Sequence, residues 1–190
     1  MTIAYPAMNR IKNNVPAFLD CIHNLDVVMF QWMMKRKHLE LWVRLCRLFS
    51  RTADGFTYPV IGLTLYAWGG KEGQLFTLTM AAAFLLERPL YLILKKGLKR
   101  NRPAQAIANF DSFIIPSDKF SFPSGHTSGA FAMATGLSLY LPELGALAFG
   151  WATLVGVSRV TLGVHFPTDT LAGATMGSAI TLISALWITL

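Results

Sequence analysis

The chain has 190 residues, of which 53% are hydrophobic and only 14% are charged, and its formal net charge is +7. A soluble domain keeps roughly a quarter of its residues charged, so this composition indicates a membrane protein with a single domain. The positive charge comes with no nucleic-acid recognition motif, and basic loops beside anionic lipid headgroups explain it more simply. Cys21 and Cys46 have no metal-binding or redox spacing, so no disulfide framework is expected.

Residues 1–54 are predicted to form amphipathic helices that lie in the membrane interface. Apolar residues recur at helical spacing at Ile22, Leu25, Val28, Met29, Trp32 and Met33, and a second amphipathic piece covers residues 39–49. The alternative is that residues 17–34 span the membrane, but Asp20 and Asp26 would make that span costly. Pro6 and Pro16 interrupt a polar N-terminus, so no cleavable signal peptide is expected.

Residues 55–190 are predicted to form the transmembrane core of one domain that covers residues 1–190. Five apolar segments are candidate membrane helices, at residues 56–68, 74–94, 127–141, 144–157 and 170–190. Many small residues in the third and fifth segments would let membrane helices pack closely. The stretch 95–125 is too polar and basic for the bilayer core, and we expect it to be an active-site loop. The fold class expected is therefore all-α, an integral membrane bundle of about five to six helices.

The alternation of these segments places all the chemically active residues on one membrane face. If each apolar segment crosses once, the end of 74–94, the start of 127–141, the end of 144–157 and the start of 170–190 lie on the same side. Those four ends carry, in chain order, Lys95 with Arg102, Ser124 with His126, Arg159, and His165 with Asp169. The sequence therefore predicts one shared site.

The cations and the start of the 127–141 segment are suited to holding a phosphoryl group. Lys95, Arg102 and Arg159 can contact its equatorial oxygens, the arginines through two parallel hydrogen bonds. Ser124 is at a helix-capping position, where its hydroxyl and the free amides of Gly125 and His126 would form an anion site. Three further cations of the basic run are expected to be interfacial charge only, namely Lys96, Lys99 and Arg100.

Two histidines on one face can divide the work of displacing a phosphate ester. One attacks phosphorus as a neutral imidazole, and the other, protonated, gives its proton to the leaving oxygen. His165 is four residues before Asp169, and Pro167 lies between them at a predicted first helical position. The carboxylate of Asp169 would then reach back to one ring nitrogen of His165. His165 is thus the better candidate nucleophile, and His126 the candidate general acid.

The spacing of these residues resembles that of the type 2 phosphatidic acid phosphatase (PAP2) superfamily, in its membrane lipid phosphatase branch. The matching residues are Lys95 with Arg102-Pro103, the PSGH of residues 123–126, and Ser158-Arg159 with His165 and Asp169. The resemblance implies that His165 becomes a phosphohistidine that water hydrolyses, with Asp169 as its partner and His126 handling the leaving-group proton. It also implies that Lys95, Arg102, Ser124, Gly125 and Arg159 bind phosphate, without a metal or other cofactor.

The resemblance further implies a class of substrate and a location. The substrates would be lipid phosphates or diphosphates such as undecaprenyl diphosphate, phosphatidylglycerophosphate or phosphatidic acid. The protein would be in the bacterial inner (plasma) membrane with its site at the extracytoplasmic face, although the many cations on that face favour the cytoplasmic side by the positive-inside rule. The alternatives are an enzyme like the vanadate-dependent haloperoxidases, or a non-catalytic membrane protein that keeps a phosphate pocket. Glu87, inside an apolar segment, is expected to pair with Arg88 or another cation.

Overall fold

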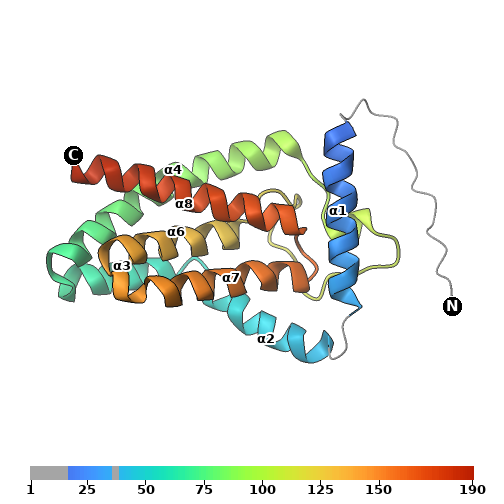
Figure 1. The fold of residues 1–190 in the computed structure, drawn as a ribbon, viewed down its shortest axis with the longest axis horizontal. Helices are drawn as coiled ribbons and strands as arrows, with labels where there is room; N and C mark the ends of the chain where they lie inside the picture. The colour runs from blue at the N-terminus through green and yellow to red at the C-terminus, as the bar shows by residue number, and fades with distance from the viewer. Residues whose placement is uncertain (1–16, 36–38) are drawn as a thin grey trace.

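The computed structural model describes residues 17–35 and 39–190, and within them the regular secondary structure is all helical, without a strand. The prolines at positions 6 and 16 lie outside the described residues. Five long helices run side by side along the molecule in Figure 1. They are α3 (Thr57–Trp68), α4 (Gly70–Leu98), α6 (Gly125–Tyr140), α7 (Gly145–Thr161) and α8 (Pro167–Thr189). Two short helices, α5 (Pro103–Ala106) and the 3-10 helix η1 (Pro142–Leu144), lie in the connections between them.

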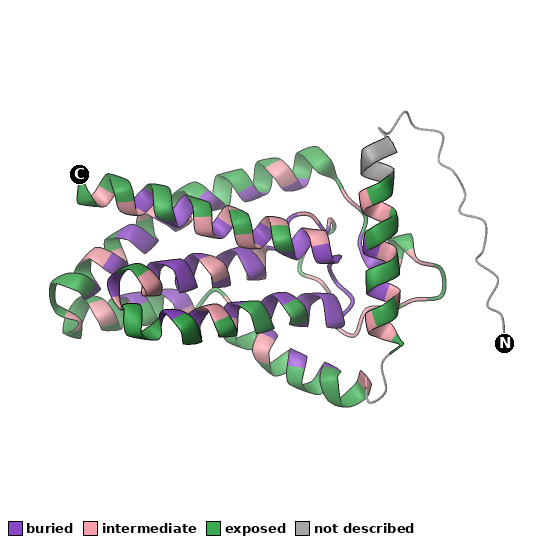
Figure 2. Cartoon of the chain, in the orientation of Figure 1, coloured by how far each residue is buried: buried purple, intermediate pink, exposed green. Residues whose placement is uncertain are grey.

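Helix α6 is the central element of the bundle and packs against α4, α7 and α8. Most of its residues are buried, as the purple of its ribbon in Figure 2 shows. Small residues let its neighbours approach closely: a Cβ added to Gly173 would lie 2.5 Å from the carbonyl oxygen of Ser124, and one added to Gly177 would lie 2.1 Å from that of Ser128. The backbones of α6 and α8 are therefore in contact, as small residues permit in membrane helices.

Three helical segments of the described chain are long and apolar enough to cross a membrane, at residues 70–106, 142–161 and 167–189. This confirms the predicted all-helical membrane fold. The predicted membrane segments correspond to α3, α4, α6, α7 and α8, with ends that differ by a few residues. Both α4 and α7 continue four residues beyond their predicted ends, to Leu98 and Thr161. Lys95 therefore lies in the last turn of α4 and not in the loop predicted to begin there.

The two N-terminal helices, α1 (Ala17–Met34) and α2 (Leu39–Thr52), lie outside the five-helix bundle. In Figure 1, α1 crosses the end of the bundle where α8 begins, nearly perpendicular to the bundle helices. Its inner side buries Asp26 and Phe30, whereas an apolar stripe faces outward at Leu25, Val28, Met29 and Trp32. If the bundle helices cross the membrane, α1 has the orientation of a helix that lies along the interface.

Candidate active site

The four helix ends predicted to share a membrane face do meet at one end of the bundle. These are the end of α4, the start of α6, the end of α7 and the start of α8 (Figure 1). Polar contacts join them: the amide of Ser124 donates to the carbonyl of Asp169 at 3.0 Å, and the guanidinium of Arg102 donates to the carbonyl of Val164 at 2.5 Å. The structure thus brings together the four helix ends that the alternation of apolar segments predicted to share a face.

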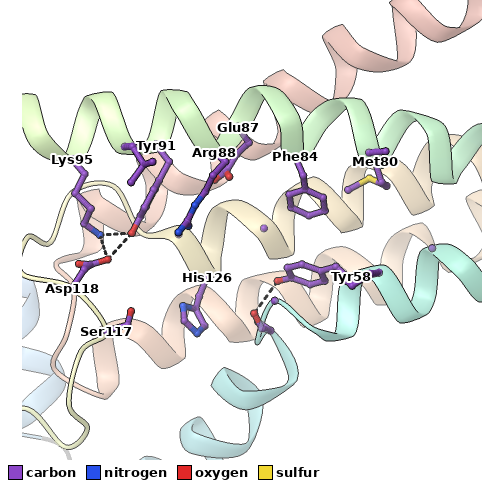
Figure 3. A pocket seen from close by; sticks show the side chains of 18 of the residues that line it. Tyr58, Met80, Phe84, Glu87, Arg88, Tyr91, Lys95, Ser117, Asp118 and His126 are labelled. Carbon is purple, nitrogen blue, oxygen red and sulfur yellow. Dashed lines mark hydrogen bonds and ion pairs between the residues drawn. The ribbon is translucent and has the colours of Figure 1, made fainter.

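Lys95 and Arg102 are buried cations that share the carboxylate of Asp118. Figure 3 shows the Lys95 side of this contact. The Nζ of Lys95 lies 2.8 Å from Oδ2 of Asp118, and Nη2 of Arg102 lies 2.6 Å from Oδ1. The hydroxyl of Tyr91 also donates to Oδ2, at 2.7 Å. Although burial alone would raise the pKa of Asp118, these hydrogen bonds and the charge of Lys95 lower it to about 2. Asp118 is thus an anion held by two of the cations predicted to bind phosphate.

His165 is buried between Arg102 and Asp169 in the turn that connects α7 to α8. Its Nε2 lies 3.5 Å from Nη1 of Arg102, and its Nδ1 lies 3.7 Å from Oδ2 of Asp169. The second distance is longer than a hydrogen bond, and Nδ1 has no hydrogen-bond partner among the described residues. Burial lowers the pKa of His165 to about 4; the charges of Arg102 and Arg159 act in the same direction, and Asp169 opposes them. The imidazole is therefore neutral near pH 7.

Asp169 lies in the first turn of α8, as Pro167 at the start of that helix predicted. Its carboxylate accepts the amide hydrogen of Phe166 at 2.8 Å and pairs with Arg100 at 2.7 Å. The second guanidinium nitrogen of Arg100 lies 2.5 Å from Asp26 of α1, which is 1% exposed. The assignment of Arg100 to interfacial charge was therefore wrong. Lys99, in a left-handed conformation with φ of 47°, ends α4 and lets the chain turn Arg100 toward α8.

The start of α6 places Ser124, Gly125 and His126 at the same end of the bundle. Ser124 is the residue before the helix, as predicted, but its hydroxyl contacts Thr127 at 2.9 Å and does not cap a backbone amide. A Cβ on Gly125 would lie 3.1 Å from the ring of Tyr91, so this glycine allows the two helices to approach. Nε2 of His126 lies 3.2 Å from Oδ1 of Asp54, a partner that the sequence analysis did not identify.

Arg159, at the end of α7, is buried and donates to Ser50 of α2 at 2.6 Å. Its Nε is buried with no hydrogen-bond partner among the described residues. A buried guanidinium whose donors are incompletely satisfied is suited to accept an anion. Glu87, in contrast, accepts a hydrogen bond from Ser128 at 2.8 Å. It does not form the expected close ion pair with Arg88 or another described cation, although the charge of Arg88 still acts on it.

A large cavity opens beside this polar cluster, between α3 and α4 (Figure 3). Its volume is about 1010 Å³. Apolar and small side chains line most of it, among them Pro59, Leu63, Met80, Ala81 and Phe84, and its polar end carries Lys95, Asp118 and His126. His165, Arg102 and Arg159 do not line it. Asp118 lines the cavity and pairs with Arg102, whose guanidinium in turn lies 3.5 Å from Nε2 of His165.

No group of three histidine, cysteine or carboxylate side chains in the described part of the chain is arranged to hold a metal ion. The chemistry available at this site is that of cations, two imidazoles and carboxylates. Buried cations can bind an anionic ester, and a neutral imidazole beside them can attack it.

The sequence model of the PAP2 superfamily matches residues 74–190, which contain every residue of the predicted site. This chain belongs to the PAP2 superfamily. The resemblance in motif spacing is thereby confirmed, and the helices that carry the three PAP2 motifs are the ones that meet at the polar end of the bundle.

Named PAP2 relatives match part of the chain. Phosphatidylglycerophosphatase B of Bacillus subtilis (strain 168) is 35% identical over 143 residues, which are 66% of this chain and 64% of that protein. An undecaprenyl-diphosphatase of Sulfolobus acidocaldarius is 41% identical over 130 residues, or 66% of this chain and 60% of that protein. The chain thus spans less than two thirds of either relative.

Two solved structures share the fold over most of the chain. Aquifex aeolicus LpxE aligns with a TM-score of 0.74 at 28% identity, covering 84% of this chain and 94% of that one. A transmembrane PAP2 type phosphatidylglycerolphosphate phosphatase from Bacillus subtilis aligns with a TM-score of 0.68 at 25% identity, covering 93% and 88%. Like these bacterial PAP2 proteins, the chain is an integral membrane protein with helical spans.

Proposed function

We propose that this protein is a membrane phosphatase that hydrolyses a lipid phosphate or diphosphate through a phosphohistidine at His165. The observation that carries the proposal is the position of Arg102, whose guanidinium contacts the Asp118 carboxylate at 2.6 Å and lies 3.5 Å from Nε2 of His165. An anion that replaced the Asp118 carboxylate on Lys95 and Arg102 would therefore lie next to that nitrogen. The membership in the PAP2 superfamily supports the same assignment.

The proposed reaction has two displacements at phosphorus. In the first, the lone pair of His165 Nε2 forms a P–N bond as the P–O bond to the lipid breaks, and His126 gives its proton to the departing oxygen. In the second, water attacks the phosphohistidine, His126 accepts its proton, and inorganic phosphate leaves. Lys95, Arg102 and Arg159 bind the equatorial oxygens throughout, with the amides of Gly125 and His126 at the start of α6 and the hydroxyl of Ser124 as further donors.

Asp169 acts in this scheme as a positioning residue for His165. Its carboxylate is fixed by the amide of Phe166 and by Arg100, and it lies 3.7 Å from Nδ1 of His165. As Nε2 takes on phosphorus, the ring becomes positively charged, and the nearby carboxylate stabilises that charge. The Arg100 contact keeps Asp169 in place and partly offsets its charge.

The cavity between α3 and α4 suits the lipid part of the substrate. Its apolar walls lead from the bundle's mid-section to the polar end, where His126 and Lys95 lie. A lipid tail in this cavity would bring its headgroup to the catalytic end of α4. Undecaprenyl diphosphate, phosphatidylglycerophosphate and phosphatidic acid all combine such a tail with a terminal phosphate, and the names of the relatives include activities of the first two kinds.

We place this site at the extracytoplasmic face of a bacterial plasma membrane. Lys99 is exposed beside the site, so a cysteine at this position can be labelled from the side of the membrane on which the site lies. The replacement is made in a background with Cys21→Ser and Cys46→Ala, because Cys21 is itself exposed. Labelling of Lys99→Cys by a membrane-impermeant thiol reagent in intact cells is the expected result, and labelling only after lysis would place the site in the cytoplasm.

Phosphate release from a panel of lipids tests the reaction. The purified protein in detergent is given isoprenyl diphosphates and phosphoglycerolipids, with and without a chelator. His165→Ala and His126→Ala should each lose release by at least about a hundredfold. Arg44→Gln, which removes an exposed arginine on α2, is the control and should keep wild-type activity. Full activity in either histidine variant would refute the roles assigned here.

A further inference from the structure

Arg88 is an exposed cation on the membrane-spanning helix α4, and none of the site's motifs includes it. It lines the cavity between α3 and α4, seven residues before Lys95. In Figure 3 its guanidinium points into the cavity, on the side of Tyr91 away from Lys95 and toward His126. The sequence analysis considered Arg88 only as a possible partner for Glu87.

Among the described residues, no carboxylate lies within ion-pair distance of the Arg88 guanidinium, although its charge interacts with that of Glu87. The adjacent Glu87 is buried and accepts its hydrogen bond from Ser128 on α6. The contact that Arg88 does make is with the ring of Tyr91, whose centroid lies 5.4 Å from its Cζ. An ionic group in a membrane span is costly, and such groups generally mark the path of a substrate or ion.

The ring of Tyr91 separates two cations that face the same cavity. Lys95 Nζ lies 4.5 Å from the ring centroid, on the catalytic side, and Arg88 lies on the side of the lipid-binding walls. The two residues are two helical turns apart, about 10 Å along the axis at the backbone, and their long side chains converge on Tyr91. His126, the proposed acid, faces the same part of the cavity.

We propose that Arg88 is a specificity-determining residue that binds a second phosphate group on the lipid side of the scissile P–O bond. This inference rests on the proposed function, because it takes Lys95 as a ligand of the phosphate that is transferred. With that phosphate on Lys95 and the leaving oxygen at His126, the next part of the substrate lies beside Arg88. A planar guanidinium can bind the oxygens of a phosphate there through two hydrogen bonds.

The contact would act on the leaving group during the reaction. When a diphosphate is cleaved, the P–O bond breaks toward the lipid, and the electron pair stays on an oxygen of the departing lipid phosphate. Its negative charge therefore grows in the transition state, and a nearby guanidinium stabilises it more strongly than the ground state. When a lipid monophosphate is cleaved, the electron pair stays on the alcohol oxygen that His126 protonates, and no second phosphate group is present for the guanidinium to bind. Arg88 should therefore favour lipids that carry two phosphates.

Two kinds of lipid have this chemistry, and one experiment distinguishes them. An isoprenyl diphosphate carries the second phosphate directly on the first, whereas phosphatidylglycerophosphate carries it beyond a glycerol. The kcat/KM of the full-length protein in detergent is measured for both, and for the matched monophosphates, isoprenyl phosphate and phosphatidic acid. The variants are Arg88→Gln and Arg88→Lys, with Arg44→Gln as the control that removes an arginine outside the cavity.

Arg88→Gln should lower kcat/KM by about tenfold to a hundredfold for one or both two-phosphate lipids and by less than about threefold for the monophosphates. If only the isoprenyl diphosphate loses kcat/KM, Arg88 binds a second phosphate that is joined directly to the first. If only phosphatidylglycerophosphate loses it, Arg88 binds a phosphate beyond the glycerol. Arg88→Lys, which keeps the positive charge, should lower kcat/KM for the two-phosphate lipids less than Arg88→Gln does. An equal loss on all four lipids, or no loss on any, would overturn the proposal. A wild-type protein that releases phosphate from none of them would instead refute the proposed function.

Discussion

Asp118 forms an ion pair with Lys95 in which Oδ2 lies 2.8 Å from Nζ. The same carboxylate contacts Arg102 through its other oxygen. Two of the three cations assigned to the substrate phosphate are thus bound to a loop carboxylate. Under the proposed function, a phosphate that binds Lys95 and Arg102 beside His165 would take the place of this carboxylate, so we expect Asp118 to compete with the substrate for the same donors.

Replacing Asp118 with asparagine should therefore strengthen the binding of inorganic phosphate. The neutral amide competes less well for Lys95 and Arg102, and we expect the inhibition constant for phosphate to fall about tenfold. The same change leaves two buried cations without a counter-ion, so the melting temperature should fall as well. Both are measured on the purified protein, by product inhibition and by thermal unfolding. Weaker phosphate binding in Asp118→Asn would show that Asp118 organises the cations and does not compete with the substrate.

The contact between Asp26 and Arg100 should couple helix α1 to the catalytic end. Asp26 is buried, accepts the amide hydrogen of Thr168 at 3.0 Å, and pairs with the guanidinium that also binds Asp169. Asp26→Asn should lower the free energy of unfolding by about 2 kcal/mol, because it breaks a buried ion pair. It should also reduce kcat, because Arg100 then interacts more strongly with Asp169, its remaining carboxylate partner. Asp111→Asn, at an exposed loop position, is the matched control and should change neither. An unchanged kcat in Asp26→Asn would limit α1 to a role in stability.

The close packing of α6 and α8 should not tolerate a methyl group at Gly177. An added Cβ would lie 2.1 Å from the carbonyl oxygen of Ser128, and a backbone atom cannot move aside as a side chain can. Gly177→Ala should therefore cost at least about 2 kcal/mol of stability. Gly150→Ala provides the comparison, because a Cβ there meets nothing within 4 Å and alanine favours the helix. Equal melting temperatures for the two variants would contradict the packing described.

The activity should persist to unusually acid pH. Burial lowers the pKa of His165 to about 4, so its neutral, nucleophilic form predominates above that pH and is lost only as the pH falls through about 4. We expect the acid limb of kcat/KM to lie near pH 4, after correction for the titration of the substrate phosphate measured by phosphorus NMR. Burial and the charge of Arg159 also lower the pKa of His126 to about 4 in the substrate-free protein, so the proposed acid has to gain its proton in the complex, where the phosphate anion raises its pKa. An acid limb near pH 6.5, the ordinary value for histidine, would show that His165 is less buried or more strongly paired than its environment indicates.

The sequence predicted the parts of the site that are set by helix order and motif spacing. Lys95, His126, Arg159 and His165 lie near the ends of apolar segments, so alternate crossing was enough to bring them together. Pro167 likewise predicted the start of α8 and hence the place of Asp169 in its first turn.

The contacts between distant segments could not be predicted in this way. Asp118 lies 23 residues from its partner Lys95, and Asp26 lies 142 residues from its partner Thr168. No periodicity in the sequence relates either aspartate to its partner. Arg100 was misassigned because it follows Lys96 and Lys99, which are both exposed, and only the turn after α4 directs it inward. Arg88 and Tyr91 were visible as polar residues within an apolar helix, but their shared cavity depends on where α3 packs.

Trapping the covalent intermediate tests the central claim most directly. The protein is mixed with a lipid substrate whose terminal phosphate carries phosphorus-32, quenched in alkali within milliseconds, digested and analysed by mass spectrometry. We predict an alkali-stable, acid-labile label on the peptide that contains His165, and no label in His165→Ala. Label on another residue, or phosphate release by wild-type protein at full rate with no labelled protein at any time, would contradict a phosphohistidine at His165.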